Sequence, residues 1–172
     1  MFLNRDKKFM KIALDEAEQS FKRGDFPIGA VLVIDGKMVD KCKNNSLSSN
    51  KWISHAKTIL LSKNSALIKK CKESGSVVEL YTTLEPCLMC LGVSVHHRLN
   101  RIIYACPDPN SGATHLKPLT IKKRYADLWP KIQSGLMKED SFKIMLAFFE
   151  GGKTEKWKKK NAKLFKSMQK SW

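Results

Sequence analysis

The segment Cys87-Leu88-Met89-Cys90 constrains this chain more than any other feature, because two cysteines separated by two residues can both bind one metal ion. Pro86, directly before it, suits the first position of a helix, where a missing N–H group costs nothing. Residues 77–83 are rich in β-branched and aromatic side chains and contain no Pro or Gly, which predicts a strand. We therefore expect the pair at a strand-to-helix junction, where the positive helix end lowers thiol pKa values and favours metal binding.

The cysteine pair alone is compatible with two kinds of metal site. A closed structural zinc site would take its remaining ligand from His96, His97 or Cys106. A catalytic site would keep one coordination position open. The sequence around the pair favours the catalytic kind.

Four segments resemble the tRNA adenosine deaminases of the cytidine deaminase superfamily, and the resemblance extends from about Phe9 to about Phe149. The segments are, in order, Phe26-Pro27-Ile28-Gly29-Ala30-Val31-Leu32-Val33; Asn44, eleven residues before His55; Thr83-Leu84-Glu85-Pro86-Cys87-Leu88-Met89-Cys90; and His96-His97-Arg98-Leu99-Asn100-Arg101-Ile102-Ile103-Tyr104-Ala105 with Asp108-Pro109-Asn110-Ser111-Gly112-Ala113. Together they are far more specific than any one of them.

The resemblance implies a Zn²⁺ site formed by His55, Cys87 and Cys90, with the attacking water in the fourth position. It also implies that Asn44 and the backbone at Ala30 contact the target nucleoside. Asp108 falls in the segment that resembles the substrate loop of the family. The implied substrate is the anticodon stem-loop of a tRNA, deaminated from adenosine to inosine at the wobble position. The implied assembly is a homodimer, or a heterodimer with a related deaminase subunit.

One residue departs from the family signature at the centre of the chemistry. The family has a glutamate two residues after its zinc-binding histidine, and this chain has Lys57. That glutamate takes a proton from the water and delivers protons to the base, and positioned acid–base catalysis contributes roughly 10²–10⁴-fold. An ammonium group already holds its proton and cannot accept another, so we predict that Lys57 impairs or abolishes deamination. Glu85, the nearest carboxylate in sequence to the ligands, is expected to have a structural role at the helix start.

The order of the expected elements predicts an α/β fold. Helices are expected at about residues 6–21, 55–70, 87–97 and 141–149, and strands at 28–34, 38–42, 77–83 and 101–106. Asp35-Gly36 predicts a hairpin between the first two strands. This order and the resemblance predict a three-layer α/β/α architecture with a mixed, mostly five-stranded sheet. The Pro- and Gly-rich segment from Pro107 to Pro118 predicts a long functional loop.

The C-terminal segment, residues 153–172, is expected to form a basic helix within the same domain as the deaminase-like residues 1–152, after a hinge at Gly151-Gly152. It contains eight lysines and one glutamate, and its apolar residues Trp157, Leu164, Met168 and Trp172 recur at helical spacing. Since the family's C-terminal helix contributes to tRNA binding, we predict RNA contacts for Lys158, Lys159, Lys160 and Lys163. A membrane-surface helix is the alternative.

The composition indicates which partners and which cellular compartment to expect. Its formal net charge of +16 favours a polyanionic partner, although a lysine-rich proteome would also explain part of the excess. With two of five cysteines assigned to metal, Cys42, Cys71 and Cys106 are expected to be free thiols, which favours a reducing cytoplasm. No stretch approaches the roughly 18 apolar residues of a membrane span, so we expect a soluble protein.

Two hypotheses from different classes remain open. The first is a zinc-dependent tRNA adenosine deaminase that Lys57 weakens or silences. The second is a non-catalytic, RNA-binding zinc protein that partners an active deaminase. A free cytosine or guanine deaminase is a third possibility, which the substrate loop from Asp108 to Ala113 and the basic tail disfavour.

Overall fold

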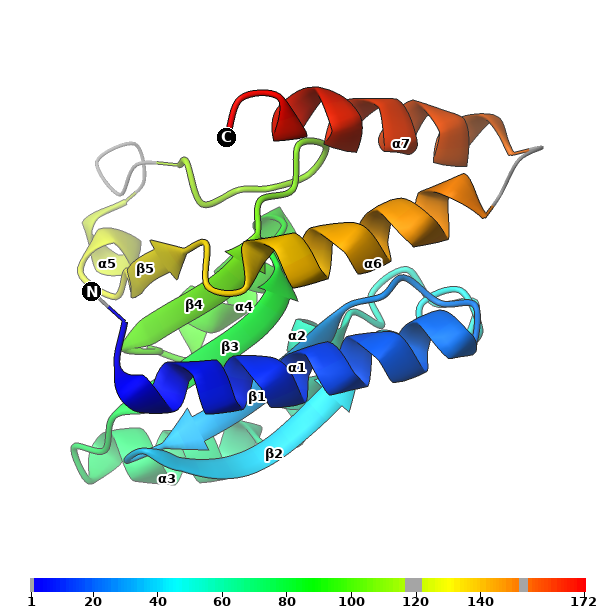
Figure 1. Cartoon of the computed structure of the whole chain (residues 1–172). Coiled ribbons are helices and arrows are strands. Elements are labelled where there is room, and N and C mark those ends of the chain that lie inside the picture. Colours follow the sequence, from blue (N-terminus) through cyan, green and yellow to red (C-terminus); the bar gives the residue numbers. More distant parts are fainter. Residues whose placement is uncertain (1, 117–121, 152–154) are drawn as a thin grey trace.

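A five-stranded mixed sheet lies at the centre of the computed structural model, which describes residues 2–116, 122–151 and 155–172 (Figure 1). The strand order is β2-β1-β3-β4-β5. Strand β1 runs antiparallel to both of its neighbours, whereas β3, β4 and β5 are parallel. The strands are β1 (Gly29–Ile34), β2 (Lys37–Lys43), β3 (Val78–Leu84), β4 (Arg101–Cys106) and β5 (Lys131–Ser134).

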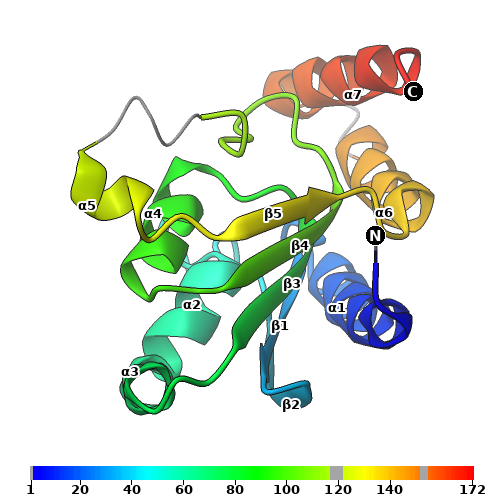
Figure 2. The ribbon, with the colours of Figure 1, turned by 90° about the vertical axis from the view of Figure 1, so that its left-hand side faces the viewer.

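Helices cover both faces of this sheet, which confirms the predicted α/β/α layers (Figure 2). One face carries α1 (Asn4–Lys22) and α6 (Lys138–Glu150). The other face carries α2 (Ala56–Lys63), α3 (Ser65–Glu73) and α4 (Leu88–His96). The short α5 (Lys123–Ala126) precedes β5, and α7 (Lys156–Gln169) packs against α6. No helix in the described part of the chain is long and apolar enough to span a membrane.

Strand β1 shows why the sheet must be covered on both sides. Ala30, Leu32 and Ile34 belong to the apolar cluster that includes α2 and α4, whereas Val31 and Val33 belong to the cluster under α1. Gly29 permits the close approach of α1, because a Cβ atom there would lie 1.9 Å from the carbonyl oxygen of Ala13. The glycine of the Pro-Ile-Gly-Ala segment is therefore required by helix packing.

Several predicted elements differ from the structure. The hairpin at Asp35-Gly36 is confirmed, with φ of 49° and 76° at these residues. The single helix expected at residues 55–70 is wrong, because α2 ends before Asn64, whose amide donates hydrogen bonds to Leu60 O and Asp40 Oδ2. Strand β5 and helix α5 were not predicted, since the β5 sequence Lys-Ile-Gln-Ser lacks any apolar pattern.

Helix α7 is attached to the rest of the molecule by aromatic side chains. Phe165 is buried, and its ring centroid lies 5.3 Å from that of Phe149. Trp157 packs on Phe26 and Trp172 on Phe142. The aromatic side of the helix therefore packs on the domain, although the apolar residues singled out in the sequence did not include Phe165, the one buried side chain of the helix. Gly152 of the expected hinge and Pro118 of the expected loop lie outside the described residues.

A buried ionic cluster joins the start of α1 to the starts of β3 and β4. Arg101 Nη2 lies 2.5 Å from Asp6 Oδ2, and its Nη1 lies 3.0 Å from Glu79 Oε1. The Tyr81 hydroxyl donates to Asp6 Oδ1 at 2.6 Å. Burial alone would raise the pKa of the Asp6 carboxyl, but hydrogen bonds from Arg101 and Tyr81 hold that pKa below its usual value.

Substituting Arg101→Met is expected to lower the free energy of unfolding by about 3–5 kcal/mol, because the buried Asp6 carboxylate loses its cation and Glu79 keeps only the partly exposed Arg5. Urea denaturation at pH 7 measures this effect. As a control, Lys123→Met breaks the exposed Lys123–Asp127 pair and should change stability by less than about 1 kcal/mol. Because the pKa of Asp6 is depressed in the folded state, its contribution is complete above the unfolded-state pKa and falls as the pH drops through the folded value. An Arg101→Met effect no larger than the control would contradict this role.

Candidate active site

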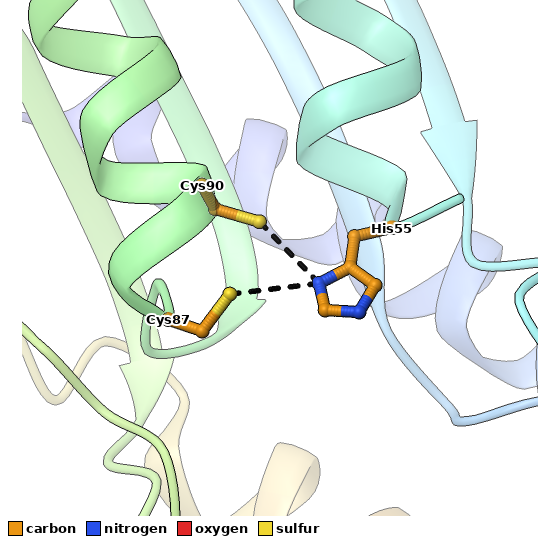
Figure 3. Close-up of side chains that lie close together, drawn as sticks. All are labelled: His55, Cys87 and Cys90. Carbon is orange, nitrogen blue, oxygen red and sulfur yellow. Dashed lines mark hydrogen bonds between the residues drawn. The ribbon is translucent and has the colours of Figure 1, made fainter. Parts of the chain in front are cut away.

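The N-termini of two helices converge beyond the C-terminal end of β3. His55 is the N-cap residue of α2, and Cys87 is the N-cap residue of α4. Cys90 follows in the first turn of α4. Figure 3 shows the three side chains pointing toward one another from these two helix ends. The strand-to-helix junction expected for the cysteines is present. Pro86 lies one residue before the N-cap and not at the first helical position, since Cys87 still has an extended backbone.

The spacing of the three ligand atoms fits a tetrahedral zinc ion. His55 Nδ1 lies 3.6 Å from Cys87 Sγ and 3.5 Å from Cys90 Sγ. Zinc bonds of about 2.3 Å to sulfur and 2.05 Å to nitrogen at tetrahedral angles place the two donor atoms about 3.6 Å apart. All three donors lie within 4.8 Å of one another. The three residues therefore fit a zinc ion, the metal that one imidazole and two thiolates imply.

Electrostatics favour a thiolate at this position. A hydrogen bond from Cys90 lowers the pKa of Cys87, against the opposing effect of burial, and the contact with His55 lowers it further. Cys87 at the N-cap and Cys90 in the first turn both lie at the N-terminus of α4, where the helix dipole favours negative charge. Thr58 Oγ1 also lies 3.5 Å from Cys90 Sγ.

No fourth metal-binding side chain joins this group among the described residues. His97 is bonded elsewhere, with Nδ1 2.9 Å from Val93 O and Nε2 3.0 Å from Ser65 Oγ. His96 and Cys106, the other candidates for a closed structural site, are not part of the group either. Three protein ligands match a site that keeps one position open.

Lys57 occupies a buried position beside the ligands. It is 2% exposed, and Nζ donates hydrogen bonds of 3.2 Å to both Thr82 Oγ1 and Leu84 O. Thr82 Oγ1 in turn donates to Gly29 O at 3.1 Å. This chain of contacts links Gly29 of β1 to Lys57, two residues after the metal ligand His55. The positive charge of Lys57 also lowers the pKa of Cys87, although it contributes less than the hydrogen bonds do.

Glu85 fastens the loop after β4 to the start of α4. One carboxylate oxygen accepts hydrogen bonds from the Thr114 amide and hydroxyl, and the other accepts from the Asp108 amide. A Cβ atom on Gly112 would lie 2.3 Å from Glu85 Oε2, so the loop needs glycine there. The contacts therefore agree with the expected structural role of Glu85. The Asp108 side chain is held locally by Asn110 and Ser111.

Asn44 has one polar atom that the described residues do not satisfy. Its side-chain oxygen accepts hydrogen bonds from the Ser46 amide and hydroxyl, both at 2.9 Å. Its Nδ2 group is buried and has no partner within the described part of the chain. A buried amide donor without a partner is costly, so this position favours a bound acceptor. The sequence motif predicted Asn44 as a site residue but gave no indication of the free donor.

The four lysines predicted to bind RNA do not share one environment. Lys158 is turned inward, with a side chain 16% exposed, an ion pair to Glu155 and its ammonium 4.8 Å from the ring centroid of Phe148. Lys159, Lys160 and Lys163 are exposed on α7, and Lys159 and Lys163 line an open groove between α6 and α7. All five cysteines, including Cys42, Cys71 and Cys106, are free.

Comparison with known proteins places this geometry in a family. Residues 3–106 match the family model described as the cytidine and deoxycytidylate deaminase zinc-binding region. The chain belongs to this family. The matched span contains all three ligands and Lys57.

Curated relatives of the chain share most of its length. A tRNA-specific adenosine deaminase from Rickettsia bellii is 33% identical over 82% of this chain and 97% of that protein. One from Bacillus subtilis is 29% identical over 92% and 98%. A solved structure from work on A-to-I editing by tRNA:A34 deaminases at the wobble position has 32% identity and a TM-score of 0.63, covering 80% of this chain and 98% of that one. A guanine deaminase from Nitrosomonas europaea, 15% identical with a TM-score of 0.69, shares the fold.

Removal of zinc is expected to destabilise the protein, because the metal binds only the folded arrangement of His55, Cys87 and Cys90. The purified chain should contain roughly one zinc ion, and a chelator should lower its Tm. Cys87→Ser should lose the metal and the chelator effect together. Cys71→Ser, which alters a half-buried thiol outside the ligand group, is the matched control and should keep both. Metal analysis and thermal unfolding measure the outcome, and full zinc content in Cys87→Ser would contradict the assignment.

Proposed function

We propose that this chain is a tRNA-binding zinc deaminase homologue whose adenosine-to-inosine activity is impaired by Lys57. The observation that carries the proposal is the position of Lys57, buried two residues after His55 and beside the two cysteines. The curated relatives named as tRNA-specific adenosine deaminases support the substrate class. Bound zinc would supply Lewis-acid activation of a water molecule.

Lys57 changes both the charge of the site and its capacity to accept a proton. Two thiolates and a neutral imidazole offset the charge of a zinc ion, so the ammonium makes the local charge positive where a glutamate would make it negative. All the contacts of Nζ are donor contacts, to Thr82 Oγ1 and Leu84 O. The side chain therefore fixes a proton donor at a place where deamination requires a group that first accepts a proton.

Asn44 and the loop held by Glu85 support a nucleoside as the ligand. The free Nδ2 donor of Asn44 is suited to an acceptor on a base or sugar. In our proposal Asn44, the backbone at Ala30 and Asp108 contact the nucleoside, while His55, Cys87 and Cys90 hold the metal. A non-catalytic RNA-binding subunit would use the same residues without turnover, and the buried Lys57, with its two hydrogen bonds, favours it as the second candidate.

Substituting Lys57→Glu is expected to raise the rate of inosine formation by about 10²–10⁴-fold, because it supplies the missing proton acceptor. The assay measures inosine in an anticodon stem-loop RNA together with binding of that RNA. Lys57→Gln is the matched control, since it removes the cation without supplying a base. It should bind RNA and remain inactive.

The outcomes separate the candidate functions. Binding by all three proteins with inosine only from Lys57→Glu supports an impaired deaminase. Binding without inosine from any of them favours the non-catalytic subunit. Equal rates from the parent chain and Lys57→Glu would show that Lys57 does not impair catalysis.

The exposed lysines of α7 should contribute to RNA affinity by neutralising phosphates. The triple substitution Lys159→Gln, Lys160→Gln and Lys163→Gln is expected to weaken stem-loop binding and to reduce the slope of its salt dependence by about one for each phosphate that is no longer neutralised. Lys158→Gln is the control, because Lys158 packs inward against Phe148 and Glu155. Binding isotherms at several salt concentrations test this. An unchanged slope in the triple variant would place the RNA away from α7.

A further inference from the structure

Trp52 is the most exposed large apolar residue that the structure describes, and it lies three residues before the metal ligand His55. Its exposed fraction is 91%, and that of its neighbour Ile53 is 66%. Leu88, directly after the ligand Cys87, is also 66% exposed. Tryptophan is usually well buried, so an almost fully exposed ring beside a site calls for a binding partner. Within the described residues the ring makes no aromatic contact.

The segment that carries Trp52 is held in place by hydrogen bonds. The Asp25 carboxylate, itself buried, accepts hydrogen bonds from the amides of Leu47 and Ser48. Backbone bonds join Asn45 to Ser54, Lys51 to Ser46, Ser54 to Lys51 and His55 to Ile53. The exposed ring therefore stands on a fixed backbone that leads directly into the metal site.

We propose that Trp52 is a stacking platform for an unpaired RNA base next to the nucleotide that enters the metal site. This inference rests on the proposed function and specifies how the RNA is recognised. Unpaired bases stack on aromatic side chains, and an exposed, fixed indole provides such a surface. Lys51, adjacent to Trp52, is exposed and adds a positive charge for the phosphate of the same nucleotide.

The charge of the molecule favours RNA as the occupant of this surface. The formal net charge of +16 attracts a polyanion. The apolar surface also borders the group formed by His55 and Cys87, where the proposed substrate base must enter. A ring at this border is placed for contact with the neighbours of that base.

The test compares the parent chain with Trp52→Ala, Trp52→Phe and Leu67→Ala in binding to an anticodon stem-loop and to a blunt duplex of the stem alone. Trp52→Ala should weaken stem-loop binding by about tenfold and leave duplex binding unchanged. Trp52→Phe should recover most of the loss. Leu67→Ala removes an exposed apolar side chain from α3 and should have no effect. A stem-loop with 2-aminopurine at one loop position at a time should show quenching at one position, by the parent and Trp52→Phe but not by Trp52→Ala.

Failure of this inference is distinguishable from failure of the proposed function. If the parent chain binds no stem-loop, the proposed tRNA function fails, and the inference fails with it. If the parent binds and Trp52→Ala binds equally well with the same 2-aminopurine signal, only the stacking role is overturned. If Trp52→Ala instead lowers the mass of an oligomer in solution without changing loop-base quenching, the surface is a protein interface and the inference is wrong.

Discussion

The convergence of two helix N-termini at the end of β3 is the constraint on which the site depends. Both α2 and α4 direct unpaired N–H groups and positive dipole ends toward one point, and both begin there with a metal-ligating side chain. Such a point favours thiolates, and a hydrogen bond from Cys90 lowers the pKa of Cys87 there. The sheet fixes this convergence, because α2 packs on β1, α2 contacts α4, and α4 follows β3 directly. The ligand spacing is thus set by the packing of α2 on the sheet and against α4.

The two ends of the parallel strands have different tasks. The starts of β3 and β4 carry Glu79 and Arg101, which with Asp6 form a closed ionic cluster that fastens α1 to the sheet. The ends of the same strands carry Leu84 and Cys106, next to the metal ligands and the loop held by Glu85. Stability is concentrated where every charge has a partner. Asn44 Nδ2, by contrast, is a buried polar group that lacks a partner within the described residues.

The sequence predicted the α/β class, the hairpin, the strand β4 and the zinc ligand group, because each depends on a local pattern or a motif. Asp35-Gly36 specifies its turn by positive φ, and the Cys87-x-x-Cys90 spacing lets both thiols reach one metal ion, whereas His55 and the identity of the metal followed from the family resemblance. The break at Asn64 was missed because one side-chain amide, bonded to Leu60 and Asp40, interrupts an otherwise helical pattern. Strand β5 was missed because its place comes from pairing with β4 and not from its own residues. The inward orientation of Lys158 depends on Phe148, a residue of another helix, so the local sequence could not predict it.

The contacts of Lys57 indicate what a carboxylate would meet at the same position. Leu84 O is an acceptor, so it repels a carboxylate oxygen where it now binds an ammonium. Thr82 is adaptable, because its hydroxyl accepts from Lys57 while donating to Gly29 O, and it can reorient toward an anion. A glutamate at residue 57 would therefore turn away from Leu84 O. Lysine and glutamate at this position thus differ in their contacts as well as in charge: the ammonium donates a hydrogen bond to Leu84 O at the end of β3, whereas the same oxygen repels a carboxylate.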